Sequence, residues 1–118
     1  MQAGQTLDEL IALDVMEWTP HGQGFWIEDP QERDLSEFCP SSNIAHAWEV
    51  VGKMRGLGYE FALLADEQRT QVLTYAAEFD KYNGNIGETT YIRGERADTA
   101  PLAICLAALS ALGVSINA

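Results

Sequence analysis

The feature that most constrains the fold of this chain is an apolar run near its C-terminal end, "APLAICLAALSALGV" (100–114). The run carries no charge, and Ser110 is its only polar side chain. Thr99 is suited to cap the start of a helix, and Pro101 lies in the first turn, where its missing N–H is not needed. Gly113 suits the position after the last turn. The segment therefore predicts a helix that is apolar around its whole circumference and must be buried on more than one side.

The two sides of this run differ in the size of their side chains. The larger side chains form one stripe: Leu102, Cys105, Leu106, Leu109 and Leu112. We expect this stripe to lie on a sheet, with Cys105 as a packing residue, because buried cysteines usually behave as small hydrophobic residues. On the smaller side, we expect Ile104, Ala108 and Ala111 to contact another helix or a second subunit of a homo-oligomer.

No segment of the sequence predicts insertion in a membrane or export from the cell. The apolar run is shorter than the ~20 residues that span a bilayer. No basic stretch followed by an apolar run marks a signal peptide. We therefore expect a cytoplasmic protein without membrane contact, in which Cys39 and Cys105 are free thiols.

Two further segments have the 3.6-residue periodicity of amphipathic helices. The first begins at Thr6 as its cap and reaches Trp18. The second runs from about 43 to 57, with its N-cap among residues 41–43. Trp18 and Trp48 lie on the apolar stripes of these two helices, so we expect both to be core residues.

After the second helix the period changes to two residues. Alternating apolar positions predict strands over 59–65 and 71–79, and a shorter strand over 88–94. The dipeptide Asn83-Gly84 between the last two strands is a strong turn signal. The sequence therefore predicts an α+β fold of order α-α-β-β-β-α, with a three-stranded antiparallel meander and helices packed on it as an α/β/α sandwich.

The length of 118 residues fits a single domain, 1–118, with an irregular segment over 19–43 between the first two helices. The net charge of −11 is concentrated in the first third, where residues 8–37 hold nine acids and one base, Arg33, a net of −8. Such a field repels phosphate backbones, which argues against direct binding to nucleic acid. It favours a partner protein with a basic surface, such as a nucleic-acid-binding surface.

The irregular segment also holds two adjacent aromatic residues among its acids. Long loops in compact domains are often functional, and aromatic residues within a polar rim make good interface anchors. The predicted protein-binding residues are Phe25, Trp26, Glu28, Asp29, Glu32, Asp34 and Glu37. A second candidate site consists of Arg93 and Arg96, which precede the last helix and are candidates to bind an anionic ligand.

The chain carries no recognised catalytic or cofactor-binding motif, and no phosphate-binding loop, metalloprotease motif or nucleophile elbow is present. Cys39 and His46 are seven residues apart, but a nucleophilic pair also needs a group that orients the histidine. No spacing of ligands supports a metal site. We therefore expect no enzymatic activity, no catalytic residue, no metal and no cofactor.

Three segments together resemble the phage ABA sandwich domain family: "LDELIALDVMEW" (7–18), "IAHAWEVVGKM" (44–54) and "ADTAPLAICLAALSALG" (97–113). The resemblance implies a three-layer α/β/α domain encoded by phages or prophages, without an assigned activity. Residues 19–40 depart most from the family pattern, so a role located there is not implied by the resemblance.

These observations predict a non-catalytic phage accessory protein that binds a host protein. An acidic inhibitor of a host defence system, such as an anti-CRISPR protein, is the sharpest version, because its carboxylates would occupy positions that phosphates take. Two alternatives remain open. One is an oligomeric protein that sequesters a nucleotide signal, and the other is a structural protein of the virion.

Overall fold

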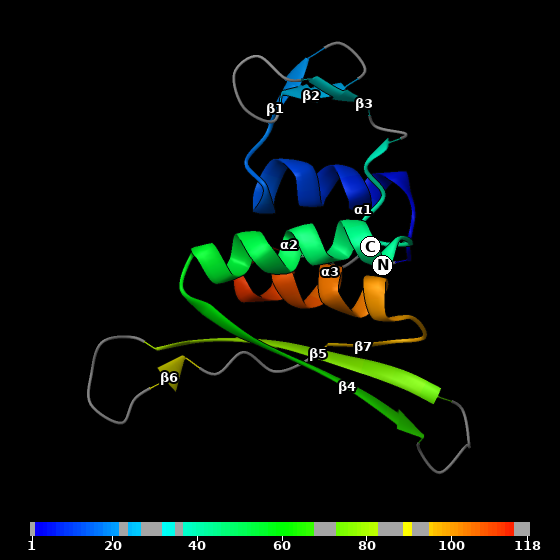
Figure 1. Ribbon diagram of the computed structural model, residues 1–118, viewed down its shortest axis with the longest axis vertical. Coiled ribbons are helices and arrows are strands. Elements are labelled where there is room, and N and C mark those ends of the chain that lie inside the picture. Colours follow the sequence, from blue (N-terminus) through cyan, green and yellow to red (C-terminus); the bar gives the residue numbers. More distant parts are fainter. Residues whose placement is uncertain are drawn as a thin grey trace.

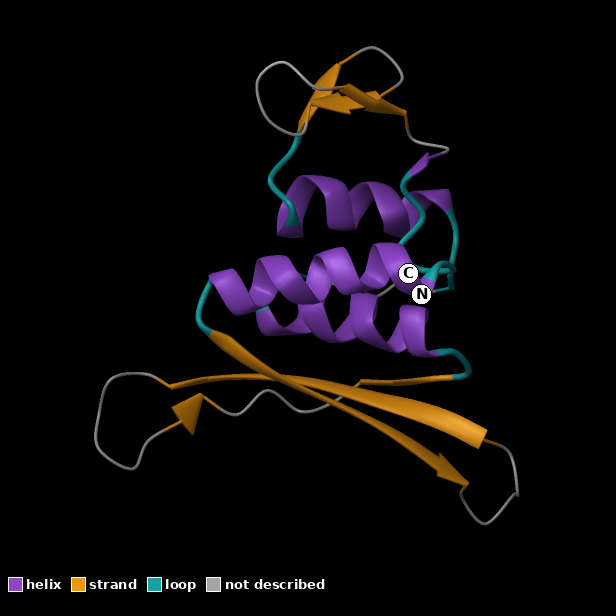
Figure 2. Cartoon of the chain, in the orientation of Figure 1, coloured by secondary structure: helices purple, strands orange, loops and turns teal. Residues whose placement is uncertain are grey.

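The computed structural model describes residues 2–21, 24–26, 32–34, 37–67, 73–82, 89–90 and 95–114. The described elements form three layers, a small sheet, a layer of helices and a larger sheet (Figures 1 and 2). The α+β class and the packing of helices on an antiparallel sheet are confirmed. The expected sandwich needs one refinement, since every described helix lies on the same side of the larger sheet.

The helical layer contains α1 (Gln5–Leu10), which continues directly into the π-helical turn η1 (Ile11–Val15). It also contains α2 (Ile44–Gly56) and α3 (Ala100–Ala111). The prediction that Thr6 caps the first helix is wrong, because the N-cap is Gly4, two residues earlier, and the helix has no side-chain cap.

The ends of the other two helices agree with their capping signals. The side chain of Asn43 accepts hydrogen bonds from the backbone N–H groups of Ala45 and His46 at the start of α2. At the start of α3, the Thr99 hydroxyl accepts the N–H of Leu102 at 3.4 Å. Gly113 follows α3 with a φ of 75°, a conformation that favours glycine.

The larger sheet is built on the long antiparallel pair of β4 (Tyr59–Glu67) and β5 (Leu73–Tyr82). Two short strands, β6 (Thr89–Thr90) and β7 (Glu95–Ala97), pair with β5. Of the predicted third strand over 88–94, the structure describes only residues 89–90, which form β6, and β7 was not predicted. The three residues of β7, Glu-Arg-Ala, do not alternate between apolar and polar. They form a strand because they pair with β5.

The small sheet corrects the prediction of an irregular segment over 19–43. It contains β1 (Thr19–His21), β2 (Gly24–Trp26) and β3 (Glu32–Asp34), joined in that order as antiparallel neighbours. His21 pairs with Gly24, so only two residues connect β1 to β2. The strands β1 and β3 were not predicted because three residues are too few to show an alternation.

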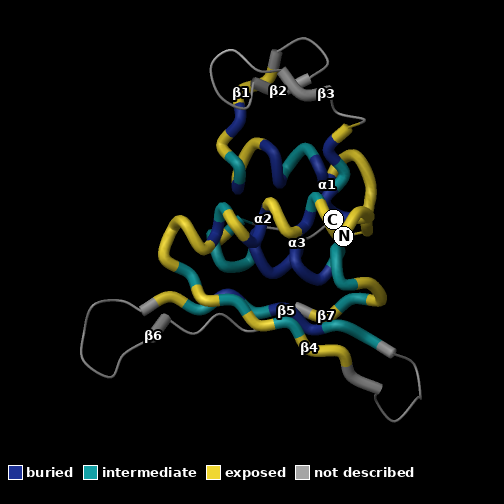
Figure 3. The backbone as a smooth tube through the Cα atoms, viewed as in Figure 1, coloured by how far each residue is buried: buried dark blue, intermediate teal, exposed yellow. Residues whose placement is uncertain are grey.

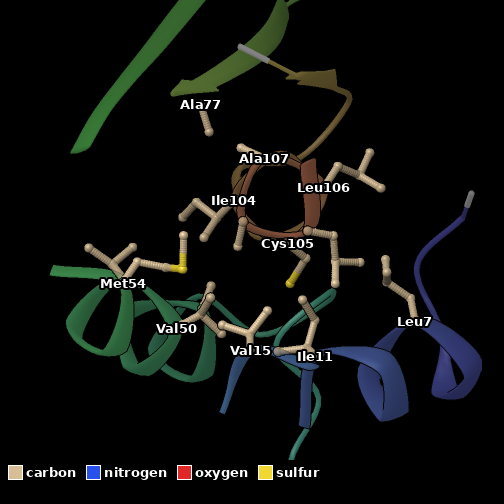
Figure 4. Close-up of a cluster of buried hydrophobic side chains, with 14 of the residues drawn as sticks. Leu7, Ile11, Val15, Val50, Met54, Ala77, Ile104, Cys105, Leu106 and Ala107 are labelled. Carbon is tan, nitrogen blue, oxygen red and sulfur yellow. The ribbon is translucent and has the colours of Figure 1, made fainter. Parts of the chain in front are cut away.

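The hydrophobic core lies between the helices and the inner face of the larger sheet (Figure 3). Side chains from α1 and η1, α2, α3 and β5 meet there, with α3 at the centre (Figure 4). The expectation that the stripe of α3 holding Cys105 lies on the sheet is wrong. Figure 4 shows Ala107 directed at Ala77 of β5, while Cys105 is directed at Ile11 and Val15. Because Ala107 and Ala77 are small, α3 can approach the sheet closely. The larger side chains Ile104 and Cys105 are directed toward the other helices.

The two tryptophans predicted as core residues have different environments. Trp18 is 7% exposed and its ring lies 4.5 Å from that of Phe38. Trp48 is 50% exposed, so its assignment to the core is wrong. Val50 is fully buried instead, because the buried face of α2 is rotated away from the stripe that the sequence indicated.

Candidate functional site

The residues predicted to bind a protein partner fall on or beside the small sheet. Phe25 and Trp26 lie in β2, and Glu32 and Asp34 lie in β3. Trp26 pairs with Glu32 in the register of these two strands, and Gly24 pairs with Asp34. The pairing brings aromatic and acidic positions into one small sheet on the far side of the helices from the larger sheet (Figure 1).

Two of the predicted residues, Glu28 and Asp29, lie outside the described residues. Glu37 is exposed just before Phe38, which packs in the core. Near the small sheet, Asp14 and Glu17 are also exposed. Acidic positions therefore continue from the small sheet onto η1 and the residues that follow it.

Glu17 has two unusual features at the end of η1. Its φ is 61°, in the left-handed region that non-glycine residues rarely adopt. Its carboxylate pairs with the ammonium group of Lys53 on α2 at 3.1 Å. The carboxylate side chain is 70% exposed, so the pair adds little stability. It does align the end of η1 with α2.

The two residues considered as a nucleophilic pair do lie together. The Sγ of Cys39 is 3.6 Å from the Nδ1 of His46, and the backbone N–H of Cys39 donates to the same Nδ1 at 3.0 Å. This ring nitrogen has one lone pair, which the backbone N–H already engages. The arrangement therefore suits a structural role, in which His46 accepts the backbone N–H of Cys39 just before α2.

The second cysteine lies in the core beside a buried carboxylate. Cys105 is fully buried, and its burial, followed by the negative charge of Asp8, raises the pKa of the Cys105 thiol far above its ordinary range. A thiol with a raised pKa stays protonated and is a poor nucleophile. The geometry agrees with the prediction that Cys105 is a packing residue.

The arginines predicted to bind an anion cannot be compared as a pair, because Arg93 lies outside the described residues. Arg96 is exposed in β7, and its Nη1 lies 3.5 Å from the Oγ1 of Thr74. The register pairs Arg96 with Ala76, on the side of the sheet away from the helices. The anion site therefore stays a prediction.

The side of α3 with the smaller side chains packs against other elements of the same chain. Ile104 and Ala108 are fully buried, and Ala111 is half-buried. Figure 4 shows Ile104 directed toward Met54 of α2. A second subunit is therefore not needed to cover Ile104 and Ala108.

Sequence reasoning missed a groove between α2 and β4, which encloses about 640 Å³. It is lined by Trp48, Val51, Arg55, Gly58, Tyr59, Glu60 and Phe61. The indole ring of Trp48 meets the ring of Phe61 edge-on, with centroids 5.8 Å apart. The i, i+7 spacing of Trp48 and Arg55 on one helix face was the signal that could have indicated this surface.

Charged side chains accompany the aromatic residues of the groove. Within the described part of the chain, the side chains of Arg55 and Glu60 have no hydrogen bond or ion pair. The ammonium group of Lys81 lies 5.3 Å from the centre of the Tyr59 ring, in a cation–π arrangement. The groove therefore combines an aromatic wall with the exposed guanidinium group of Arg55 and the exposed carboxylate of Glu60.

Two further types of site were sought over the described ranges alone. No helix there has both the length and the apolar character needed to cross a membrane. Among the same residues, no three side chains of histidine, cysteine, aspartate or glutamate lie close enough together to hold a metal ion.

Comparison with known proteins gives a family and a fold. The model of the "Phage ABA sandwich domain" matches residues 9–109. A solved structure, titled "2.0 A Crystal Structure of a Phage Protein from Bacillus cereus ATCC 14579", is similar with a TM-score of 0.59 and 21% sequence identity. The match covers 93% of this chain and 91% of that one. No curated protein sequence matches the chain.

Proposed function

We propose, since this chain belongs to the phage ABA sandwich domain family, that it is a phage accessory protein that binds a host protein and catalyses no reaction. The observation that carries this proposal is the acidic small sheet, which lies on the outer side of the helices. The partner would present a basic surface, of the kind that binds nucleic acid. An inhibitor of a host defence system is the specific role that this chemistry favours.

The distribution of charge supports this proposal. Residues 8–37 carry a net charge of −8, and the remaining residues carry only −3 of the total of −11. Acids gathered at one end of a molecule produce a local field that steers a basic partner and raises the association rate. The aromatic positions Phe25 and Trp26 in β2 would supply the apolar centre of such an interface.

The absence of catalysis is supported by the two cysteines. Cys39 lies beside His46, but the histidine nitrogen that would act as a base already accepts a backbone N–H. Cys105 is fully buried in the core. Neither thiol therefore has the exposed, activated environment that a nucleophile needs.

The direct test captures partners from a host lysate with the purified chain and compares charge variants. The test variant replaces three acids of the small sheet and its exit: Glu32→Gln, Asp34→Asn and Glu37→Gln. The matched control replaces three acids on the larger sheet: Glu60→Gln, Glu78→Gln and Asp80→Asn. Both variants change the net charge by the same amount.

The proposal expects that a captured partner binds the first variant at least tenfold more weakly and binds the control as the unchanged protein does. Raising the salt concentration should weaken binding of the unchanged protein, because exposed charges are screened. A partner that binds the first variant with unchanged affinity would exclude the acidic surface as the binding site. Equal losses in both variants would show that only total charge matters.

A second candidate function is favoured by the groove between α2 and β4. A planar ligand could stack on the half-exposed indole of Trp48 and place an anionic group at the unpaired guanidinium of Arg55. The volume of about 640 Å³ is in the range of small-molecule sites. This chemistry agrees with the alternative of a protein that sequesters a nucleotide signal.

Thermal-shift measurements with adenosine, AMP and ATP test this second function. A nucleotide that raises the melting temperature of the unchanged protein should fail to do so in Arg55→Gln. Lys53→Gln removes the same charge from α2 outside the groove lining and is the matched control. No shift with any of the three probes at millimolar concentration would argue against the groove as a nucleotide site.

A further inference from the structure

In the part of the chain that the structure describes, β4 is an edge strand of the larger sheet. Among the described strands, β4 pairs with β5 alone, so the backbone groups on its other side have no partner strand. The strand runs from Tyr59 to Glu67 and is nine residues long. Folded proteins usually shorten, cover or charge such an edge, because a long one is a template for pairing with another chain.

Exposed apolar side chains lie on α2 and on or next to β4. Leu64 of β4 is 60% exposed and pairs with Ala76, so it lies on the face of the sheet away from the helices, and Leu57, just before β4, is 37% exposed. On α2, which packs over β4, Ile44 is 43% exposed and Trp48 is 50% exposed. Of the large hydrophobic residues found exposed in the described part of the chain, only Leu13 lies elsewhere. In the described part of the chain, an edge strand, β4, therefore lies next to a face of α2 with exposed apolar side chains.

Two glycines on α2 have no role in the packing of a single chain. A Cβ atom added at Gly52 or at Gly56 would meet no atom within 4 Å. Glycine inside a helix is less favourable than alanine, so Gly52 in the interior of α2 lacks an explanation within one chain, whereas Gly56 is the last residue of the helix. Gly52 and Gly56 are one turn apart, and Trp48 precedes Gly52 by one turn, so all three lie on neighbouring positions of the exposed face.

We infer that a second copy of this chain covers this surface, with its β4 pairing antiparallel to the first β4 about a two-fold axis. A two-fold axis perpendicular to the sheet makes the two strands antiparallel and leaves both sets of helices on the same face. The sheets then join into one continuous sheet, and α2 of each copy lies beside α2 of the other. Such a contact is self-complementary, as a two-fold interface requires.

The glycines fit this arrangement because the two helices must approach closely. Paired strands are about 4.8 Å apart, whereas packed helices usually lie about 8–10 Å apart. Antiparallel α2 helices place Ile44 and Trp48 of one copy beside Gly52 and Gly56 of the other. The large side chains of one helix would thus pack against the glycines of the other, which have no side chain.

The charges also favour a second copy at this surface over other faces. The small sheet, whose strand β3 contains Glu32 and Asp34, lies across the helices from β4. On the α2–β4 side, the exposed Arg55 and Glu60 have opposite charges and no partner in the described part of the chain. A two-fold contact would let Arg55 of each copy face Glu60 of the other. The repulsion of two chains of −11 would then be smallest in this orientation.

The test measures the mass of the purified chain by light scattering after size exclusion, and by sedimentation, over about 1 to 100 µM. The inference expects twice the 13.0 kDa of a single chain at the upper end of this range. Leu64→Lys should weaken the dimer at least about tenfold by adding a charge to the strand edge. Gly52→Leu should weaken it similarly by separating the two helices.

Two controls separate loss of the interface from loss of folding. Leu13→Lys changes a leucine that is 40% exposed on η1 and should leave the dimer intact. Gly52→Leu adds a side chain where a single chain has open space, so its helix content and melting at low concentration should be unchanged or improved. Particles of 13.0 kDa at every concentration would overturn the inference, as would a dimer that Leu13→Lys weakens as much as Leu64→Lys.

The inference is independent of both proposed functions, because the mass is measured without partner or ligand. A dimer would bring the second α2 against the open side of the groove, so a nucleotide bound there would lie near the seam. A dimer that binds neither host protein nor nucleotide would support the inference and count against the proposed functions. A monomer that binds a partner through its acids would contradict the inference and support the proposed binding of a host protein.

Discussion

The carboxylate of Asp8 accepts the backbone N–H of Ser41 at 2.9 Å, although the two residues are 33 positions apart in the sequence. Asp8 is 7% exposed and Ser41 is fully buried. The Ser41 hydroxyl in turn accepts the backbone N–H of Gly4 at 3.0 Å. These two bonds join the start of α1 to the segment before α2 and thereby close the chain around the intervening small sheet.

Asp8→Ala should destabilise the protein by about 1.5–3 kcal/mol, because it leaves the buried N–H of Ser41 without its charged acceptor. Asp8→Asn keeps an acceptor oxygen and should cost less. Asp14→Ala, at an exposed carboxylate, is the matched control and should cost less than about 0.5 kcal/mol. Urea denaturation monitored by circular dichroism measures all three. Equal stabilities of Asp8→Ala and Asp14→Ala would contradict the importance of this bond.

The two cysteines should differ sharply in their reactivity. Cys39 is half-buried, whereas Cys105 is fully buried with a raised thiol pKa. Iodoacetamide should therefore modify one cysteine of the native protein and both cysteines in urea, which mass spectrometry can count. Modification of Cys105 in native protein at the rate of Cys39 would show that α3 opens readily.

The same raised pKa predicts how stability depends on pH. In the unfolded chain the Cys105 thiol ionises with a pKa of about 8.5, whereas in the folded chain burial and Asp8 keep it protonated. The unfolded state therefore binds fewer protons above this pH, and the free energy of unfolding falls as the pH rises. Urea denaturation from pH 7 to 10 should show this fall, and Cys105→Ala should reduce its slope. An unchanged slope would assign the fall to other groups.

The two tryptophans placed by the structure should differ in their contribution to stability. Trp18 is 7% exposed and packs against Phe38, so Trp18→Ala should cost about 3–5 kcal/mol. Trp48 is 50% exposed, and Trp48→Ala should cost about 1–2 kcal/mol, mainly by losing its contact with Phe61. Denaturation at concentrations where the chain is monomeric compares them. Similar costs would show that Trp48 is buried in solution by another surface.

His46 should act as a structural residue of the segment before α2. His46→Ala removes the acceptor of the Cys39 N–H and should cost about 1 kcal/mol. Cys39→Ser keeps that backbone bond and should cost less than His46→Ala. Thermal melts of the two variants make the comparison, and a larger loss in Cys39→Ser would show that the thiol is the more important partner.

Several elements were predictable because their signals are local. The caps at Asn43 and Thr99 and the left-handed glycine after α3 depend on residues within one turn. The long strands β4 and β5 showed a two-residue alternation, and Ala77 and Phe79 on the expected inner face are fully buried. The family followed from the apolar segments of the helices, and it is confirmed over residues 9–109.

Other features could not be predicted because they depend on which surfaces meet. The three strands of the small sheet have three residues each, and they form because neighbouring strands supply the hydrogen bonds. The rotation of α2 that exposes Trp48, and with it the groove beside Arg55, follows from packing against both η1 and α3. The apolar stripe of a helix indicates the direction of its buried face only approximately, so the sequence did not show this rotation of α2.

The amino-acid sequence by itself determined the class of the fold, the ends of two helices, the two long strands and the uneven charge, because each depends on neighbouring residues or on composition. Only the tertiary structure decided that α3 turns Ala107 rather than its larger side chains to the sheet, because close approach to Ala77 depends on both surfaces. It also decided that β4, among the described strands, is an edge strand next to α2 with its exposed Trp48 and Gly52. Whether a strand lies at the edge of a sheet depends on which other strands pair with it, and the residues of the strand itself do not indicate this.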